Sequence, residues 1–408
     1  MTSSTTTSPS TAADPSTTTP RVTHFGLAVL ALAMGGFAIG TTEFVSMGLL
    51  PELAEGIGVT VPTAGHLISA YALGVVVGAP LIAFLGARLP RRQLLIMLMI
   101  VFALGNAVSA VVDSYPSMLL ARFVSGLPHG AYFGVASLVA AGLAAPGKKG
   151  RAVSLVMLGL AVSNVLGVPA ATWLGQHAGW RSAYLLVAVL GALTVALVVA
   201  FVPRRPGQAT ASRRGELRAF GNPQVLLALL AGAIGFGGIF SMYTYIAPTV
   251  TEVAGLPASR VPVYLLVFGL GMVVGTSLAG RMADWSVMRS LLIGASMMGV
   301  LLAVFTRTAE WFVPGLITVF LLQVFASVLV LNLQMRLMRV AGDAQSLGAA
   351  MNHASLNMAN ALGAWLGGVV VAAGYGYRAP SWVGVGLSAG GLVVILISAA
   401  LERSQSRR

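Results

Sequence analysis

Two charged side chains stand inside long apolar runs of this sequence, and their chemistry is the first feature to explain. Glu43 lies in the run 25–50. A charged residue in such a run is costly unless it faces protein or water, so it is a functional candidate. Because burial favours the neutral form of a carboxyl group, Glu43 is suited to binding a proton on one side of a barrier and releasing it on the other. The alternative is a structural carboxylate near a helix end.

Arg122 is the second such residue, in the run 117–143. At helical spacing it shares a face with His129 and Phe133, which are candidates to line a cavity. We expect Arg122 to sense or relay protonation of a carboxylate across that cavity. The alternatives are an ion pair that only orders the helices and, for His129, a hydrogen-bonded packing role. Small residues that predict close helix packing recur at every fourth position: Gly126, Gly130 and Gly134.

Uncharged polar and aromatic side chains in other runs complete the candidate site. Asparagine amides suit hydrogen bonding to a neutral ligand, but they also join helices to one another. Phe240 and Tyr243 share one helical face, and ordinary packing is the alternative to lining a cavity. The polar candidates lie in two further runs and are Asn164, His353, Asn357 and Asn360.

The sequence offers no pattern for metal or covalent chemistry. It contains no cysteine, which excludes thiolate ligands and disulfides. No His-Glu-x-x-His cluster occurs. We therefore expect a protein that is not an enzyme, with no metal and no cofactor, which draws on a proton gradient. A membrane-embedded enzyme or sensor is the remote alternative.

The composition places these residues in a membrane protein. Of the 408 residues, 57% are hydrophobic and 9% are charged, against about a quarter charged in soluble proteins. A surface facing hydrocarbon needs few polar side chains, whereas one facing water needs many. The formal charge of +13 falls in short clusters between apolar runs, which argues against a nucleic-acid partner.

Runs long enough to cross about 30 Å of hydrocarbon predict twelve transmembrane helices and an all-α membrane protein. Residues 1–21 are rich in Ser, Thr, Pro and Ala and predict a disordered tail. The predicted spans are 25–50, 63–87, 94–112, 117–143, 151–175, 181–202, 224–248, 261–283, 288–306, 311–335, 346–373 and 380–401.

The basic residues predict the orientation of these spans. With both termini in the cytoplasm, 19 of the 24 Lys and Arg residues lie inside and four lie outside. Cytoplasmic loops carry such an excess. We therefore expect a multi-pass protein of a bacterial plasma membrane with its N- and C-termini inside.

An internal repeat predicts two related halves. Residues 71–78 match 268–275 at an offset of 197 residues, and Pro51 matches Pro248 at the same offset. Parallel duplication is typical of transporters whose halves move about a central site. We predict pseudo-symmetric six-helix bundles over 22–202 and 223–402, a cytoplasmic loop over 203–222 and a basic tail over 403–408.

Several motifs resemble those of the major facilitator superfamily. Residues 84–93 are similar to its cytoplasmic loop between helices two and three, but Ala87 replaces the usual aspartate and Pro90 the second glycine. The corresponding loop of the second repeat keeps an aspartate, Asp284. The resemblance implies that Asp284 carries part of the gating function. The basic positions that match the loop motif are Arg88, Arg91 and Arg92.

Other motifs indicate a branch of that superfamily. Residues 122–130 resemble its fourth-helix motif for proton transfer, and Gly167 and Pro169 form the core of a degenerate antiporter motif. Residues 42–51 look most like the branch that holds sugar-efflux, arabinose-induced and chloramphenicol-export proteins. The resemblance implies a monomeric proton-coupled antiporter that exports a small drug, sugar or nucleoside. A proton symporter or facilitator for import is the alternative.

Overall fold

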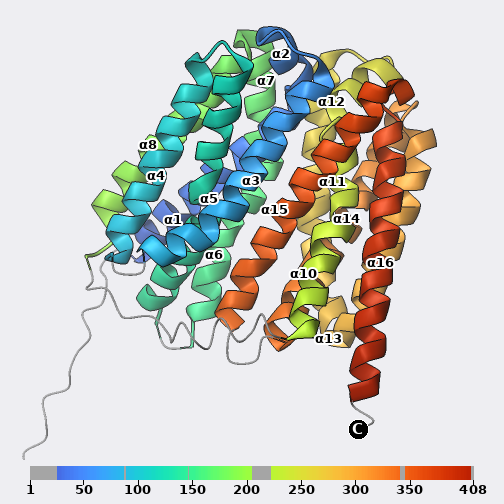
Figure 1. Ribbon diagram of the computed structural model, residues 1–408. Helices are drawn as coiled ribbons and strands as arrows, with labels where there is room; N and C mark the ends of the chain where they lie inside the picture. Colours follow the sequence, from blue (N-terminus) through green and yellow to red (C-terminus); the bar gives the residue numbers. More distant parts are fainter. Residues whose placement is uncertain (1–24, 87–88, 146, 205–221, 341–344, 406–408) are drawn as a thin grey trace, which may run out of the picture.

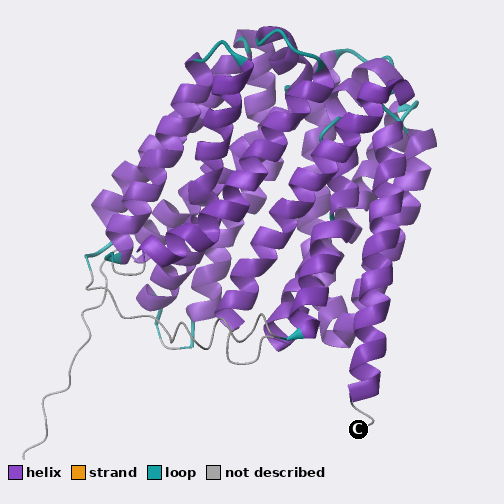
Figure 2. Ribbon diagram, in the orientation of Figure 1, coloured by secondary structure: helices purple, strands orange, loops and turns teal. Residues whose placement is uncertain are grey.

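The computed structural model describes residues 25–86, 89–145, 147–204, 222–340 and 345–405. Within these ranges the chain forms helices joined by short turns and contains no strand (Figure 2). The predicted tail 1–21, residues 205–221 of the predicted loop, Arg88 and the end of the basic tail lie outside the described residues.

The helices of the first half run side by side as a bundle (Figure 1). A short helix, α2, covers one end, which we call the α2 end, and the chain's C-terminus lies at the opposite end. The elements are α1 (Phe25–Gly48), α2 (Leu50–Gly56), α3 (Val61–Gly86), α4 (Arg91–Val111), α5 (Tyr115–Leu143), α6 (Lys149–Val162), η1 (Ser163–Gly167), α7 (Val168–Ala178) and α8 (Trp180–Phe201).

The second half forms the neighbouring bundle. Its elements are α10 (Pro223–Gly235), α11 (Gly237–Tyr243), α12 (Ile246–Pro248), η2 (Thr249–Val253), η3 (Ala258–Arg260), α13 (Val261–Thr308), α14 (Phe312–Val340), α15 (Gln345–Val370), η5 (Val371–Tyr375) and α16 (Ala379–Gln405).

Helix α13 contains two crossings. Eleven helical stretches of the described chain are long and apolar enough to span a bilayer, and one of them holds 51 residues. At about 1.5 Å per residue, the 48 residues of α13 would far exceed the hydrocarbon thickness of about 30 Å. The backbone leaves helical geometry at Ser286 (φ −172°, ψ 112°), between the predicted spans 261–283 and 288–306. The twelve predicted crossings are therefore confirmed.

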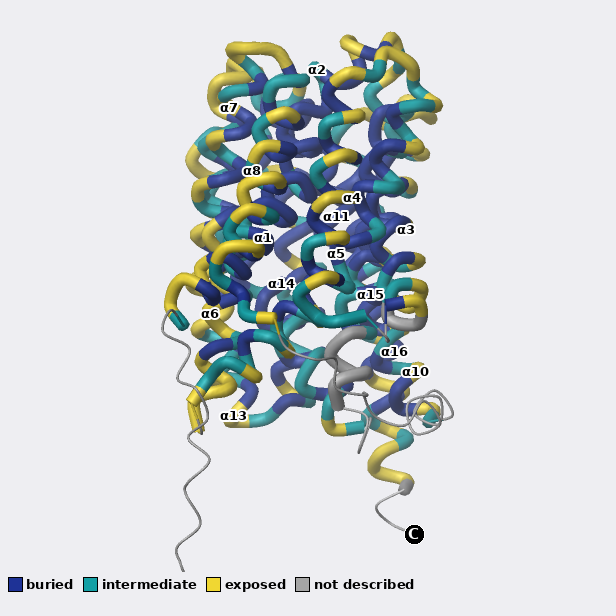
Figure 3. Tube along the Cα trace, turned by 90° about the vertical axis from the view of Figure 1, so that its left-hand side faces the viewer, coloured by how far each residue is buried: buried dark blue, intermediate teal, exposed yellow. Residues whose placement is uncertain are grey.

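Burial follows the pattern of a protein in lipid. Large apolar side chains such as Leu120 and Leu104 are 63% and 61% exposed on the outside, whereas Arg122 and Asn106 are fully buried inside. Buried segments fill the centre of the bundle and exposed ones lie on its periphery (Figure 3). Exposed hydrocarbon and buried polar groups are stable together only where the surrounding solvent is apolar.

Two predicted helices are interrupted near the middle of the protein. The fifth contains the π-helix η1, which lies directly before Pro169. The seventh is divided into α10, α11, α12 and η2. Both breaks differ from the continuous helices predicted from hydropathy, because the mean hydropathy of about twenty residues specifies a span and not its local backbone geometry.

The internal repeat is visible in duplicated contacts. A Cβ atom added at Gly74 would lie 2.1 Å from the carbonyl oxygen of Phe123, and one at Gly271 would lie 2.6 Å from that of Phe320. Both residues of the second pair follow those of the first by 197 positions. Ion pairs repeat in the same way, since Arg181 pairs with Asp113 and Arg378 with Glu310.

Candidate functional site

Arg122 is held against α1 from the facing helix α5. Its Nη1 donates to Thr42 Oγ1 at 3.0 Å and its Nη2 donates to the Thr42 carbonyl oxygen at 3.1 Å. The guanidinium also lies over two rings, 4.5 Å from the centre of Tyr71 and 5.2 Å from that of Tyr184. These contacts explain how a fully buried cation is accommodated without a paired carboxylate.

Glu43 follows Thr42 on α1 and is 7% exposed. Arg122 is close enough to attract its carboxylate electrostatically, yet the ion pairs found among the described residues do not include these two. The face that Glu43 shares with Gly36 and Gly40 packs closely on α6 and η1, since a Cβ at Gly40 would lie 2.0 Å from Ser163 Oγ. The structure thus places Glu43 near Arg122 without an ion pair between them.

His129, Phe133 and His353 form a short chain of rings across the two halves. His129 Nδ1 is 3.2 Å from the hydroxyl of Tyr71, the ring that Arg122 covers. The ring centres of His129 and Phe133 are 5.5 Å apart, and Phe133 stacks on His353 of α15 at 5.9 Å. The chain connects the surroundings of Arg122 to the second half.

Phe240 and Tyr243 lie in an aromatic cluster that also crosses between the halves. Phe44, the neighbour of Glu43, stacks on Phe240 at 6.4 Å and meets the edge of Tyr243 at 6.0 Å. Tyr243 stacks on Phe268 at 3.7 Å. These aromatic side chains are therefore internal and beside the predicted proton site.

The three asparagine candidates differ in their hydrogen bonds. Asn164 Nδ2 donates to the Leu160 carbonyl at 3.0 Å, and Asn357 Nδ2 donates to the His353 carbonyl at 3.0 Å. Asn360 is fully buried, and neither its amide oxygen nor its amide nitrogen has a partner. An unpaired buried amide is costly, so Asn360 is the residue of this group most suited to meet a ligand or water.

The predicted motif residues lie at breaks and ends of helices. Gly167 ends η1, where an added Cβ would lie 2.3 Å from Thr41 Oγ1, and Pro169 is the second residue of α7. Arg91 and Arg92 begin α4. Asp284 is exposed, two residues before the kink of α13. The sequence motifs therefore coincide with places where the backbone bends.

The predicted close packing of the α5 glycines holds for only part of the series. A Cβ at Gly126 would lie 2.1 Å from the Tyr71 carbonyl oxygen, and one at Gly130 would lie 3.0 Å from the Ala79 Cβ. Gly134 has nothing within 4 Å, so this part of the prediction is wrong. The spacing of four residues places all three on one face, but α3 meets that face only near Gly126 and Gly130.

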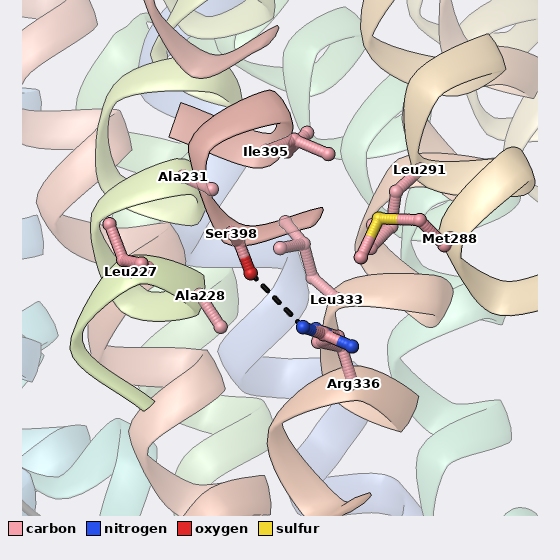
Figure 4. Close-up of a pocket in the computed structure, with 9 residues that line it drawn as sticks. All are labelled: Leu227, Ala228, Ala231, Met288, Leu291, Leu333, Arg336, Ile395 and Ser398. Carbon is pink, nitrogen blue, oxygen red and sulfur yellow. Dashed lines mark hydrogen bonds between the residues drawn. The ribbon is translucent and has the colours of Figure 1, made fainter. Parts of the chain in front are cut away.

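Arg336 is a buried charge that directly follows the predicted span 311–335 and was therefore expected in a cytoplasmic loop. It belongs to α14 and is 6% exposed, and its Nη1 donates to both carboxylate oxygens of Glu402 of α16, at 2.9 and 2.8 Å. Its Nη2 donates to Ser398 Oγ at 3.1 Å and to Gln224 Oε1 at 2.9 Å. Figure 4 shows it below an apolar pocket between the helices. The predicted span 311–335 ends one residue before Arg336, so the sequence did not identify Arg336 as a buried charge.

Comparison with known proteins identifies the family. The sequence profile of the Major Facilitator Superfamily matches residues 32–353. The chain belongs to this superfamily. As a member, the protein is a membrane transporter and not an enzyme, as predicted from the motifs.

Individual members of the superfamily are similar over nearly the whole chain. The inner membrane transport protein YdhP of Escherichia coli K12 is 40% identical over 91% of this chain and 95% of its own. A chloramphenicol resistance protein of Streptomyces lividans is 34% identical over 87% of this chain and 92% of its own. The crystal structure of a D-xylose-proton symporter has the same fold, with a TM-score of 0.71, 17% identity and coverage of 92% and 97%.

Proposed function

We propose that this transporter exports a small molecule across the bacterial inner membrane in exchange for protons, with Glu43 as the proton carrier. The observation that carries the proposal is the placement of an unpaired buried carboxyl group directly after Thr42, the residue that binds Arg122. A chloramphenicol resistance protein among the relatives supports export. The basic clusters support a topology with both termini in the cytoplasm.

In the proposed cycle, the two halves rock about the central site, and a proton and the transported molecule occupy it in turn. Glu43 takes a proton when the site opens outward and loses it when the site opens inward. Protonation removes the attraction between Glu43 and Arg122, so the charge state of the site changes in each half of the cycle. The protein acts as a monomer with protons and lipid as its other partners, and needs no cofactor, metal or nucleic acid.

The driving force is adequate for useful export. One proton that crosses about 100 mV releases roughly 2.3 kcal/mol. Each tenfold step in the gradient of an uncharged molecule costs about 1.4 kcal/mol. Exchange of one proton therefore sustains a gradient of about fiftyfold.

Everted membrane vesicles test this function with the Glu43→Gln variant. Glutamine keeps the size and polarity of the side chain but cannot exchange a proton. Addition of a transported compound to energised vesicles is expected to dissipate the pH gradient for the native protein and to have no effect for Glu43→Gln. Native-like proton movement by the Gln variant would show that Glu43 is not the carrier.

The same assay separates export from import. Proton symport or facilitated import is the rival function, because the same scaffold permits either direction. Symport predicts that substrate and protons move in the same direction, and a facilitator predicts no proton movement. Either result would overturn the antiport proposal while leaving the assignment as a transporter intact.

A further inference from the structure

Of the 14 buried side-chain polar atoms without a hydrogen-bond partner among the described residues, nine lie in the second half. In the first half, Arg122, Thr42 and Asn106 form a hydrogen-bonded series, with Thr42 Oγ1 donating to Asn106 Oδ1 at 2.6 Å. On α15, by contrast, both polar atoms of Asn360 and the Oδ1 of Asn357 are unpaired, although these residues are 0% and 3% exposed. An amide in this state has a donor or an acceptor available for another molecule.

Asn360 lies on the inner side of α15. Met358 and Val369 are 38% and 47% exposed and mark the side of the helix that faces outward. At about 100° per residue, Asn360 lies roughly opposite Val369. One turn further along, a Cβ at Gly363 would lie 3.0 Å from the Cβ of Phe240. Helix α15 therefore packs closely against α11 one turn beyond Asn360.

The repeat relates the proton site to an uncharged counterpart in the second half. At the offset of 197 residues, Glu43 corresponds to Phe240, Tyr71 to Phe268 and Arg122 to Val319. The counterparts are 6%, 4% and 0% exposed. The same positions of the fold thus hold two charges in one half and apolar or aromatic groups in the other.

We propose that the second half holds the transported molecule, through the Asn360 and Asn357 amides and the aromatic side chains Phe240 and Tyr243. The class that fits is an uncharged compound with a planar ring and both a hydrogen-bond donor and an acceptor. A ring would stack on the aromatic cluster, while the amide of Asn360 would both donate and accept. This assignment rests on the proposed function and adds the substrate class to it.

Equilibrium binding to the purified protein in lipid nanodiscs tests the assignment without a proton gradient. The probes that fit the class are chloramphenicol and adenosine, which are uncharged, carry a planar ring and offer donors and acceptors. D-Arabinose lacks the ring, and tetraphenylphosphonium carries a charge. Calorimetry is expected to show binding of at least one of the first two, and weaker or no binding of the latter two.

Asn360→Ala and Phe240→Leu are expected to raise the Kd of the bound probe about tenfold, which corresponds to about 1.4 kcal/mol. Matched controls in the same half are Thr318→Ala and Phe305→Leu, buried residues at 4% and 1% exposure, which should leave the Kd unchanged. Thr318 donates to the Pro314 carbonyl of its own helix and bonds to the hydroxyl of Thr308 on α13. Size-exclusion chromatography selects folded variants, and Asn357→Leu provides a second amide variant if Asn360→Ala does not fold.

The assignment is overturned if neither fitting probe binds, if the cation or the sugar binds more tightly, or if the amide and aromatic variants keep the native Kd. The result is independent of proton coupling. Native-like proton movement by Glu43→Gln together with weaker binding by Asn360→Ala would reject the proton carrier and keep the binding site. Loss of proton movement in Glu43→Gln together with native binding by Asn360→Ala would reject the binding site and keep Glu43 as the proton carrier.

Discussion

At the scale of single residues, the site depends on how Arg122 is held. Its two terminal nitrogens donate to the side chain and the carbonyl oxygen of one residue, Thr42. The planar guanidinium of arginine presents two nitrogen donors side by side, whereas the ammonium of lysine is a point charge. Arg122 therefore connects α5 to α1 directly beside Glu43, and both the charge and the shape of the side chain matter.

Arg122→Lys is expected to reduce the initial rate of substrate-dependent proton movement in everted vesicles by about tenfold, because the loss of one charge-assisted hydrogen bond costs on the order of 1.5 kcal/mol or more. Thr42→Val, which removes the hydroxyl acceptor, should have a similar effect. Thr194→Val is the control, since buried Thr194 bonds only to the Leu190 carbonyl of its own helix. A native rate in Arg122→Lys would mean that charge alone is required.

At the scale of elements, glycines set how closely α3 approaches α5 and how closely α13 approaches α14. Gly78 and Gly275 occupy equivalent positions, and an added Cβ would lie 2.1 Å from the Leu127 carbonyl oxygen and 2.6 Å from that of Val324. Backbone atoms yield less readily than side-chain ends. The same contact in both halves therefore explains the glycines of the repeated segment.

Gly126→Ala is expected to destabilise the protein by about 1–3 kcal/mol, as overpacking of a close contact does. The added Cβ would meet the Tyr71 carbonyl oxygen at 2.1 Å. Thermal unfolding in detergent measures the effect as a lower midpoint. Gly134→Ala, on the same face of α5 but with nothing within 4 Å, should keep the midpoint or raise it slightly, because alanine favours the helix. Equal midpoints for the two variants would contradict the packing argument.

At the scale of the whole molecule, the two halves meet through few directional contacts. Among the described residues, the hydrogen bonds between halves are those from Ser69 Oγ to the Ala361 carbonyl and from Gln176 Nε2 to the Ala258 carbonyl, each 3.0 Å. The second joins α7 to η3 at the α2 end. A rocking motion requires that such contacts break and form again.

A cross-link between the halves at the α2 end is expected to stop transport. Gln176→Cys with Ala258→Cys suits this test, because the native chain has no cysteine, so that within one molecule each introduced thiol can pair only with the other. Oxidation should abolish substrate-dependent proton movement, and reduction should restore it. A cross-link within one half, between Asp113→Cys and Arg181→Cys, is the control and should have little effect. Native transport by the oxidised Gln176–Ala258 pair would argue against the rocking motion.

The sequence alone determined that the protein lies in a membrane, how many times it crosses and that its two halves are repeats. Each of these is a property of residues that are close together in the sequence or separated by a constant offset. Hydropathy over about twenty residues specifies a span, and two charged residues in such spans were recognisable as candidates. The family followed from motifs that are continuous in sequence. These features need no knowledge of which helix lies beside which.

Only the tertiary structure decided the partners of these residues. Spacing along a helix specifies a face, but not the helix that meets it, so the contact of Arg122 with Thr42, 80 residues away, was not predictable. The pairing of Arg336 with Glu402, 66 residues away, was hidden for the same reason. The sequence also did not predict that Asn360 has no hydrogen-bond partner or that nothing packs against Gly134. Both depend on which side chains the neighbouring helices place there.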